Sequence, residues 1–275
     1  MAAETLANLV RGLESDFQDE RQKAIEAFGD RSWAGDKDAI VAVCVLIENP
    51  HPEIRCAAVQ ALSQLAERGD GLAADEVSGR IGHWLPTVRQ TAIECLGRFV
   101  TEGDEQAIED VCTCIEDDNP DVRRVAVRAL NEVAGRDKSV AISALCRRLQ
   151  SPRPEVRRSA LQALVRLVHR GESSAVAAVT ALLDHVDPNV QAVALDALGE
   201  VGREDDEDII RRVSSRISDL HVGVRNAAAK ALEQLSCKPE DKILQAVELA
   251  RHERSGSPLA QTNIAGATIR FADMP

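Results

Sequence analysis

Arginine is concentrated in the middle of this 275-residue chain, where its side chains could bind anionic groups. Residues 121–170 contain 12 basic and 4 acidic residues, whereas residues 1–120 contain 10 basic and 24 acidic residues. The planar guanidinium group suits paired hydrogen bonds to carboxylates and phosphates. The net charge of the whole chain is −12, which disfavours general nucleic-acid binding. The middle segment is therefore the first candidate for binding an acidic partner.

Cysteine and histidine, the other residues that could act as nucleophiles, general bases or metal ligands, form no recognised motif. The seven cysteines are an odd number and include no CxxC pair, which favours a reducing compartment. Cys112 and Cys114 are two residues apart and would point to different faces of a helix. A Walker loop, a GxSxG motif and an HExxH motif are all absent from the sequence. We therefore predict that the protein holds no metal or cofactor and is not an enzyme.

The sequence carries no recognisable targeting or membrane-spanning segment. The N-terminus reads as an amphipathic helix that contains Glu4, unlike a signal peptide. The longest apolar run, Ala39–Ile47, is too short to cross a bilayer. We predict a cytoplasmic protein that does not insert into membranes.

A pattern that recurs at a spacing of 34 residues determines where all these side chains lie. We call the residue that marks each recurrence the anchor position: Arg21, Arg55, Arg89, Arg123, Arg157, Gln191 and Arg225. An alanine always follows three residues later and a large apolar residue seven residues later, and a proline precedes five of the anchors by three. Such self-similarity is typical of stacked helical units that bury a core only between them.

Each unit is predicted to contain two helices. An acidic residue at the start of most units suits the positive end of a first helix, and the proline suits the first turn of a second helix. The predicted units are 2–35, 36–69, 70–103, 104–137, 138–171, 172–205 and 206–239. Residues 240–254 are predicted to form a C-terminal capping helix, which ends the repeat domain at residue 254, and residues 255–275 a flexible tail.

The segments Asn119–Arg123 (NPDVR) and Asp187–Val190 (DPNV) resemble HEAT repeats, in particular the short phycobilisome-lyase-like subclass. The resemblance covers about residues 2–254 and implies an all-α, right-handed solenoid. It implies a structural role for the anchor arginines, which in such repeats bind groups in the turns. Tetratricopeptide repeats share the period, but their pattern requires a tyrosine, and this chain has none. The family includes scaffolds, adaptors, transport factors and a few enzymes. One of these is an iron hydroxylase that needs several His-Glu pairs, and only His252-Glu253 forms such a pair here.

The second helices of this fold usually line a concave groove. In each second helix, the core positions are one residue before the anchor and three, six, seven and ten residues after it. The positions one, five and eight or nine residues after the anchor then face outward. In the fourth and fifth units, these outward positions are basic or polar: Arg124, Arg128, Arg158, Gln162 and Arg166. They would form either a binding strip for an acidic or phosphorylated protein segment, or only a solvated face.

A second candidate surface lies on the first helix of the second unit. Val41, Ala42 and Val45 make this helix apolar nearly all round, and such a helix usually has both sides covered. A protein partner or a second copy of the chain would cover it, or it is a small tolerated patch. We interpret the chain as a non-enzymatic protein-binding scaffold or adaptor. The alternative that the resemblance implies is a phycobilin-lyase-like enzyme or lyase subunit.

Overall fold

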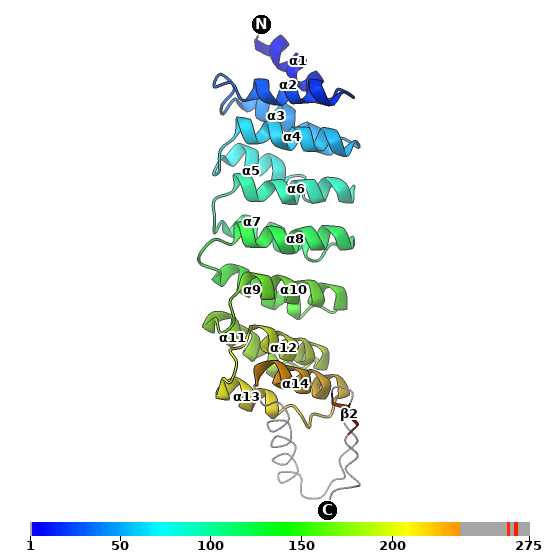
Figure 1. Cartoon of the computed structure of the whole chain (residues 1–275), viewed down its shortest axis with the longest axis vertical. Coiled ribbons are helices and arrows are strands. Elements are labelled where there is room, and N and C mark those ends of the chain that lie inside the picture. Colours follow the sequence, from blue (N-terminus) through cyan, green and yellow to red (C-terminus); the bar gives the residue numbers. More distant parts are fainter. Residues whose placement is uncertain (1, 237–262, 265–266, 269–275) are drawn as a thin grey trace, which may run out of the picture. The chain divides into compact units, whose positions relative to one another are not determined.

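The computed structural model describes residues 2–236, 263–264 and 267–268. The chain divides into two compact units, Met1–Ala141 and Ile142–Pro275, and each is described by itself. The first unit contains α1 (Ala2–Leu13), α2 (Gln18–Phe28), α3 (Lys37–Val45), η1 (Leu46–Glu48), α4 (Pro52–Leu65), α5 (Gly71–Ser78), α6 (Pro86–Phe99), α7 (Glu105–Cys114) and α8 (Pro120–Val133). The second unit contains α10 (Pro154–Leu167), α11 (Ser173–Thr180), η2 (Ala181–Asp184), α12 (Pro188–Val201), α13 (Glu207–Ser214) and α14 (Val222–Leu235), and α9 (Ser139–Leu149) spans the division (Figure 1).

The helices alternate as the 34-residue period predicts. Each predicted unit from residue 2 to residue 236 contains one first helix and one second helix. Proline occupies the first turn of α4, α6, α8, α10 and α12, where its missing N–H leaves no carbonyl unpaired. The all-α solenoid predicted from the sequence is therefore confirmed.

The core lies between successive helix pairs and is built from small and branched side chains. The alanine three residues after each anchor is buried in all seven repeats, as is the large apolar residue seven residues after it. Within the first unit, α6 packs on α8, and within the second unit α12 packs on α14. The alanines allow these second helices to approach closely, which explains how the chain builds a core with 2% aromatic residues.

The anchor side chains hold the turn between the two helices of their own repeat. Arg123 Nη1 donates hydrogen bonds to the carbonyl oxygens of Asp117 (2.7 Å) and Asp118 (3.0 Å). Equivalent bonds form at Arg55, Arg89, Arg157 and Arg225, and Gln191 keeps one of them, to the His185 carbonyl at 2.6 Å. The structural role expected for this column is confirmed, because these bonds satisfy carbonyls that the helix ends leave without partners.

Within each of the two units, backbone hydrogen bonds join neighbouring repeats at the other end of the helices. Gly69 N donates to the Phe99 carbonyl at 2.6 Å, and Gly103 N donates to the Val133 carbonyl at 2.8 Å. Both glycines have positive φ, which residues with a Cβ rarely adopt. Asp205 occupies the same place in the second unit with φ of 56°, and its N donates to the Leu235 carbonyl at 2.7 Å.

The end of the chain is only partly described. The predicted capping helix at residues 240–254 lies outside the described residues, as does most of the predicted tail. Four residues of the tail form two short strands, β1 (Asn263–Ile264) and β2 (Ala267–Thr268), which pair antiparallel.

Candidate binding surface on the second helices

The five residues predicted to line the groove lie on the outward faces of two second helices. Arg124 and Arg128 project from α8 in the first unit, and Arg158, Gln162 and Arg166 project from α10 in the second unit. The face that the helical period assigned to solvent is therefore the exposed face on both helices. Their partners, however, differ between the two helices.

On α8, both arginines already have an acidic partner within the first unit. Arg124 Nη2 lies 2.8 Å from Asp121 Oδ1 on the same helix, and Arg128 Nη2 lies 3.0 Å from Glu94 Oε1 on α6. These pairs are exposed to solvent, where an ion pair contributes about 0–1 kcal/mol. An incoming anionic group would have to compete with a carboxylate for either arginine.

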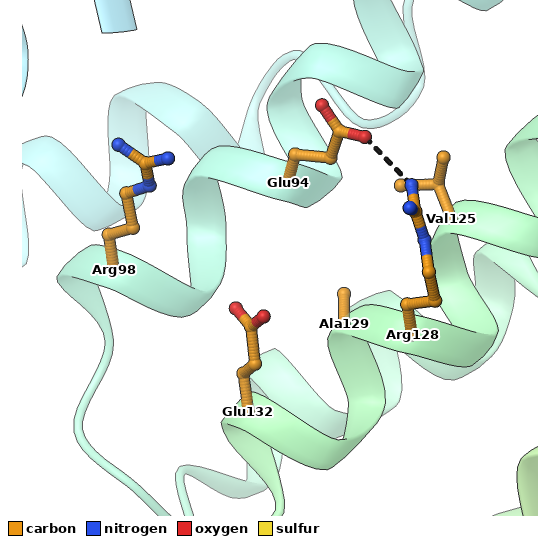
Figure 2. Close-up of a pocket in the computed structure, with 6 residues that line it drawn as sticks. All are labelled: Glu94, Arg98, Val125, Arg128, Ala129 and Glu132. Atoms are coloured by element: carbon orange, nitrogen blue, oxygen red, sulfur yellow. Dashed lines mark hydrogen bonds and ion pairs between the residues drawn. The ribbon is translucent and has the colours of Figure 1, made fainter. Parts of the chain in front are cut away.

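The Arg128–Glu94 pair borders a cleft of about 280 Å³ between α6 and α8 (Figure 2). Val125 and Ala129 line the cleft, and Arg98 and Glu132 complete its charged walls. The Glu132 side chain lies against Gly97 of α6, where a Cβ in place of the glycine hydrogen would be 2.8 Å from Glu132 Oε2. Two acids and two bases around one opening make the cleft nearly neutral.

Arg98 and Glu132 were not among the site residues predicted from the sequence. The signal was present, because each pair of charges in this cleft is separated by 34 residues: Glu94 from Arg128, and Arg98 from Glu132. In a stack of 34-residue repeats, residues at that separation occupy equivalent positions on neighbouring second helices. Opposite charges at that separation are therefore candidates for an ion pair between repeats.

On α10, Arg158 and Arg166 differ from the α8 arginines in having no partner among the described residues. Within the part of the chain that the structure describes, Arg158 and Arg166 make no hydrogen bond or ion pair. The neighbouring helix α12 does carry carboxylates on the same face, but both are engaged by α14. Lys230 Nζ donates to Asp196 Oδ1 at 2.8 Å, and Gln234 Nε2 donates to Glu200 Oε1 at 2.7 Å.

The Lys230–Asp196 contact also shifts the lysine's titration. The hydrogen bond to the Asp196 carboxylate raises the pKa of Lys230, so the lysine stays charged through the neutral range. The Asp196 carboxylate is thus already engaged by α14. The second unit thus presents two arginines without an ion-pair partner on α10, beside the neutralised Lys230–Asp196 pair and Glu200, which binds only the uncharged Gln234 amide.

The apolar patch on α3 has the predicted exposure. Val41 is 39% exposed and Val45 is 54% exposed, and Ala42 between them is half-buried. The opposite face of α3 is buried, including Ile40 and Val43. The patch is small, and the described residues do not cover it.

The described residues offer little for metal or redox chemistry. They contain no group of three or more histidine, cysteine or acidic side chains close enough to hold a metal ion. Five of the six described cysteines are buried, and only Cys56 is exposed. None of the helices in residues 2–236 is long and apolar enough to cross a membrane.

Comparison with known families decides how this architecture is classified. The family model for HEAT repeats matches three overlapping stretches, residues 6–83, 77–165 and 142–233. The chain belongs to the HEAT-repeat family. These matches cover nearly all of the described helices, in agreement with the resemblance seen at the proline-containing turns. The match does not distinguish the lyase-like subclass from other HEAT repeats.

Solved structures place this HEAT-repeat protein among α-solenoids. A crystal structure of importin beta matches with a TM-score of 0.51 and 18% identity, over 92% of this chain and 40% of that chain. An engineered protein matches with a TM-score of 0.37 and 20% identity, over 90% of this chain and 73% of that chain. The HEAT-repeat chain thus spans less than half the length of importin beta, and at this identity the likeness shows the fold alone. No curated protein sequence matches the chain.

Proposed function

We propose that this HEAT-repeat protein is a non-enzymatic scaffold that binds an acidic or phosphorylated segment of a protein partner on its second helices. The observation that carries this proposal is the difference between α8 and α10. Arg124 and Arg128 are paired with carboxylates, whereas Arg158 and Arg166 are without a partner among the described residues. The α10 arginines are therefore the main contacts, and the α8 arginines contribute less.

The spacing of the α10 side chains suggests the form of the bound segment. Residues eight apart on a helix are separated by about 12 Å along its axis. In an extended chain, residues four apart lie on one face and are about 13 Å apart. An extended segment with acidic or phosphorylated residues at positions i and i+4 would therefore meet Arg158 and Arg166 together. Gln162, between them on the same face, can donate to a backbone carbonyl of that segment.

A charge-reversal experiment tests this proposal, with a control on α8 in the first unit. The probes are a ten-residue peptide with glutamates four residues apart, its phosphoserine counterpart and its glutamine counterpart. Arg158→Glu/Arg166→Glu should weaken binding of the first two peptides about tenfold or more, since two favourable contacts become repulsive. Arg124→Glu/Arg128→Glu changes the net charge equally but should weaken binding less, because those arginines are already paired. Binding should also weaken as salt rises.

Two outcomes would contradict the proposal. Equal losses in the two double variants would mean that only overall charge matters, and unchanged binding in the α10 variant would make the strip a solvated face. Exposed substitutions of this kind change stability by no more than about 0.5 kcal/mol each, so circular dichroism should show both variants folded.

The lyase-like alternative receives no support from the described residues. A site for a tetrapyrrole needs a cavity at least as large as those that hold drug-sized ligands, about 300–1,000 Å³ with mostly apolar walls. The cleft between α6 and α8 is about 280 Å³ and has four charged side chains around it. This cleft therefore does not suit a tetrapyrrole, and we propose the scaffold rather than the lyase-like alternative.

A further inference from the structure

Each described repeat holds the turn before its second helix with one side-chain acceptor. The side chain six residues before the anchor position accepts a hydrogen bond from the backbone N–H two residues further along, at donor–acceptor distances from 2.8 to 3.3 Å. The acceptors are Ser15, Asn49, His83, Asp117, Ser151, His185 and Asp219. Five of them accept through oxygen, whereas His83 and His185 accept through Nδ1. The third and sixth repeats therefore use an acceptor that a proton can turn into a donor.

A histidine accepts a hydrogen bond only while one of its ring nitrogens has no proton. The neutral imidazole has one donor and one acceptor nitrogen, and the protonated ring is a donor at both. Rotating a protonated ring therefore supplies no acceptor. Histidine is also the side chain that ordinarily gains its charge between pH 8 and pH 5. The oxygens of serine, asparagine and aspartate keep lone pairs throughout this range, so the other five turns keep their acceptor.

The charged groups around His83 do not replace the lost acceptor. Its side chain is 18% exposed, and Nε2 lies 3.8 Å from Glu48 Oε2 of η1. Glu48 attracts a protonated ring at Nε2, but Arg80 of α5 already lies 3.0 Å from Oε1 of the same carboxylate. Arg89 of α6 binds the His83 carbonyl at 2.7 Å and not the ring. These contacts offer no lone pair to the Leu85 amide, so protonation of Nδ1 leaves that N–H without its partner.

The charged groups around His185 have both signs. The Asp187 carboxylate lies within electrostatic range of both His185 and Arg157 of α10. Asp184, directly before His185 in the chain, is bound by Arg216 of α13 at 2.6 Å. The backbone N–H of Asp187 is the group that His185 Nδ1 accepts from, at 3.0 Å. A protonated ring would gain from the Asp187 carboxylate but would lose this bond to the Asp187 backbone.

The sixth-repeat turn also has the weaker anchor. Gln191 donates one hydrogen bond to the turn, to the His185 carbonyl at 2.6 Å. At the equivalent place in the third repeat, Arg89 donates to two turn carbonyls, those of His83 and Trp84. When the histidine bond is lost, the turn before α12 therefore keeps fewer restraints than the turn before α6.

We propose that His83 and His185 make the turns of the third and sixth repeats sensitive to acid. At neutral pH each imidazole accepts from its backbone N–H and stabilises the turn. As the pH falls and the ring is protonated, that stabilisation is lost and the start of α6 or α12 opens locally, with the larger response at α12. The inference concerns turns outside α8 and α10, so it goes beyond the proposed function and does not rest on it.

Hydrogen exchange of the full chain tests the inference, followed by NMR at pH 7.5 and pH 5.5 and corrected for the intrinsic pH dependence of exchange. Protection of the Leu85 and Asp187 amides should fall about three- to tenfold at pH 5.5, as expected for the net contribution of one hydrogen bond. The His51 and Asn119 amides are the internal control, because Asn49 and Asp117 hold them through oxygen. Unchanged protection of Leu85 and Asp187, or an equal loss at the control amides, would overturn the proposal.

Two double variants separate this role from histidine charge in general. His83→Asn/His185→Asn supplies the acceptor that Asn49 supplies in the second repeat, so the Leu85 and Asp187 amides should be equally protected at both pH values. His51→Asn/His221→Asn is the matched control. It removes two histidines that lie two residues further along equivalent turns and whose side chains make no capping hydrogen bond, so the acid response should match that of the parent. An acid response that persists in the first variant, or disappears in the second, would show that the assigned histidines are wrong.

Discussion

Arg89 is the anchor residue whose replacement should cost the most stability. Arg89 Nε and Nη2 donate to the two oxygens of Asp117 at 2.7 and 2.8 Å, and Nη1 donates to the carbonyls of His83 and Trp84. The side chains of Arg89 and Asp117 are only 15% and 11% exposed, and the contact to Asp117 raises the pKa of Arg89. Arg89→Met keeps much of the apolar stem but leaves Asp117 as a nearly buried charge without its cation.

The expected loss of unfolding free energy follows from the groups that lose their partners in each variant. Breaking a buried ion pair costs about 3–5 kcal/mol, and the remaining exposure of this pair places Arg89→Met at about 2–4 kcal/mol. Arg123→Met is the matched control, because Arg123 makes the same two bonds to turn carbonyls but forms no ion pair within the described residues. Its loss should be about 1–2 kcal/mol.

Urea unfolding followed by circular dichroism measures both changes, with the slope of the transition compared between variants. Local opening in a repeat protein can broaden the transition, so hydrogen exchange of α6 and α8 gives a second reading. A loss for Arg89→Met no larger than that for Arg123→Met would refute the reasoning that the Asp117 contact sets this anchor apart.

Two further predictions concern backbone strain and thiol chemistry. Asp205→Gly should raise the free energy of unfolding by about 1 kcal/mol in urea unfolding, because φ of 56° is costly for a residue with a Cβ; an unchanged midpoint would mean that other contacts of Asp205 offset the strain. Burial raises the pKa of Cys44, Cys95 and Cys114 to about 12 and that of Cys146 to about 11. These four thiols should therefore stay protonated and unlabelled by iodoacetamide at about pH 8.5, whereas the exposed Cys56 should react. Peptide mapping of the labelled protein measures both outcomes. Rapid native-state labelling of the four would contradict their burial.

The repeat pattern predicted the fold well because the information that specifies it is local and recurs. The alanine three residues after each anchor is needed for close approach of two helices, and the proline three residues before it favours a helix start. Because both recur along the chain, they predict the helices reliably. The repeat pattern did not predict features that occur in a single repeat. Asp205 adopts the left-handed conformation that glycine adopts at the same position of four other repeats. The hydrogen bond from its backbone N–H to the Leu235 carbonyl does not depend on the side chain, so the conformation is kept.

The proposed binding surface was predictable in the exposure of its side chains but not in their hydrogen-bond and ion-pair partners. The helical period is sufficient to place Arg128 and Arg158 on the outward face, since that face depends only on backbone geometry. Whether a charge is already paired depends on the residue 34 positions away and on the rotamers of both side chains. Arg128 meets Glu94 and Lys230 meets Asp196 in this way, both at a separation of 34 residues.

The same separation shows why opposite charges in register are not sufficient. Arg98 and Glu132 are also 34 residues apart, yet Arg98 Nη1 instead donates to Ser63 Oγ at 3.3 Å, and Glu132 lies over Gly97. A missing side chain at Gly97 gives the carboxylate another place to lie. For Arg158, the residue at the corresponding position of α12 is Ala192, which offers no charge at all. A partner's carboxylate at Arg158 therefore displaces no intramolecular acid, and this is why we expect α10 rather than α8 to dominate binding.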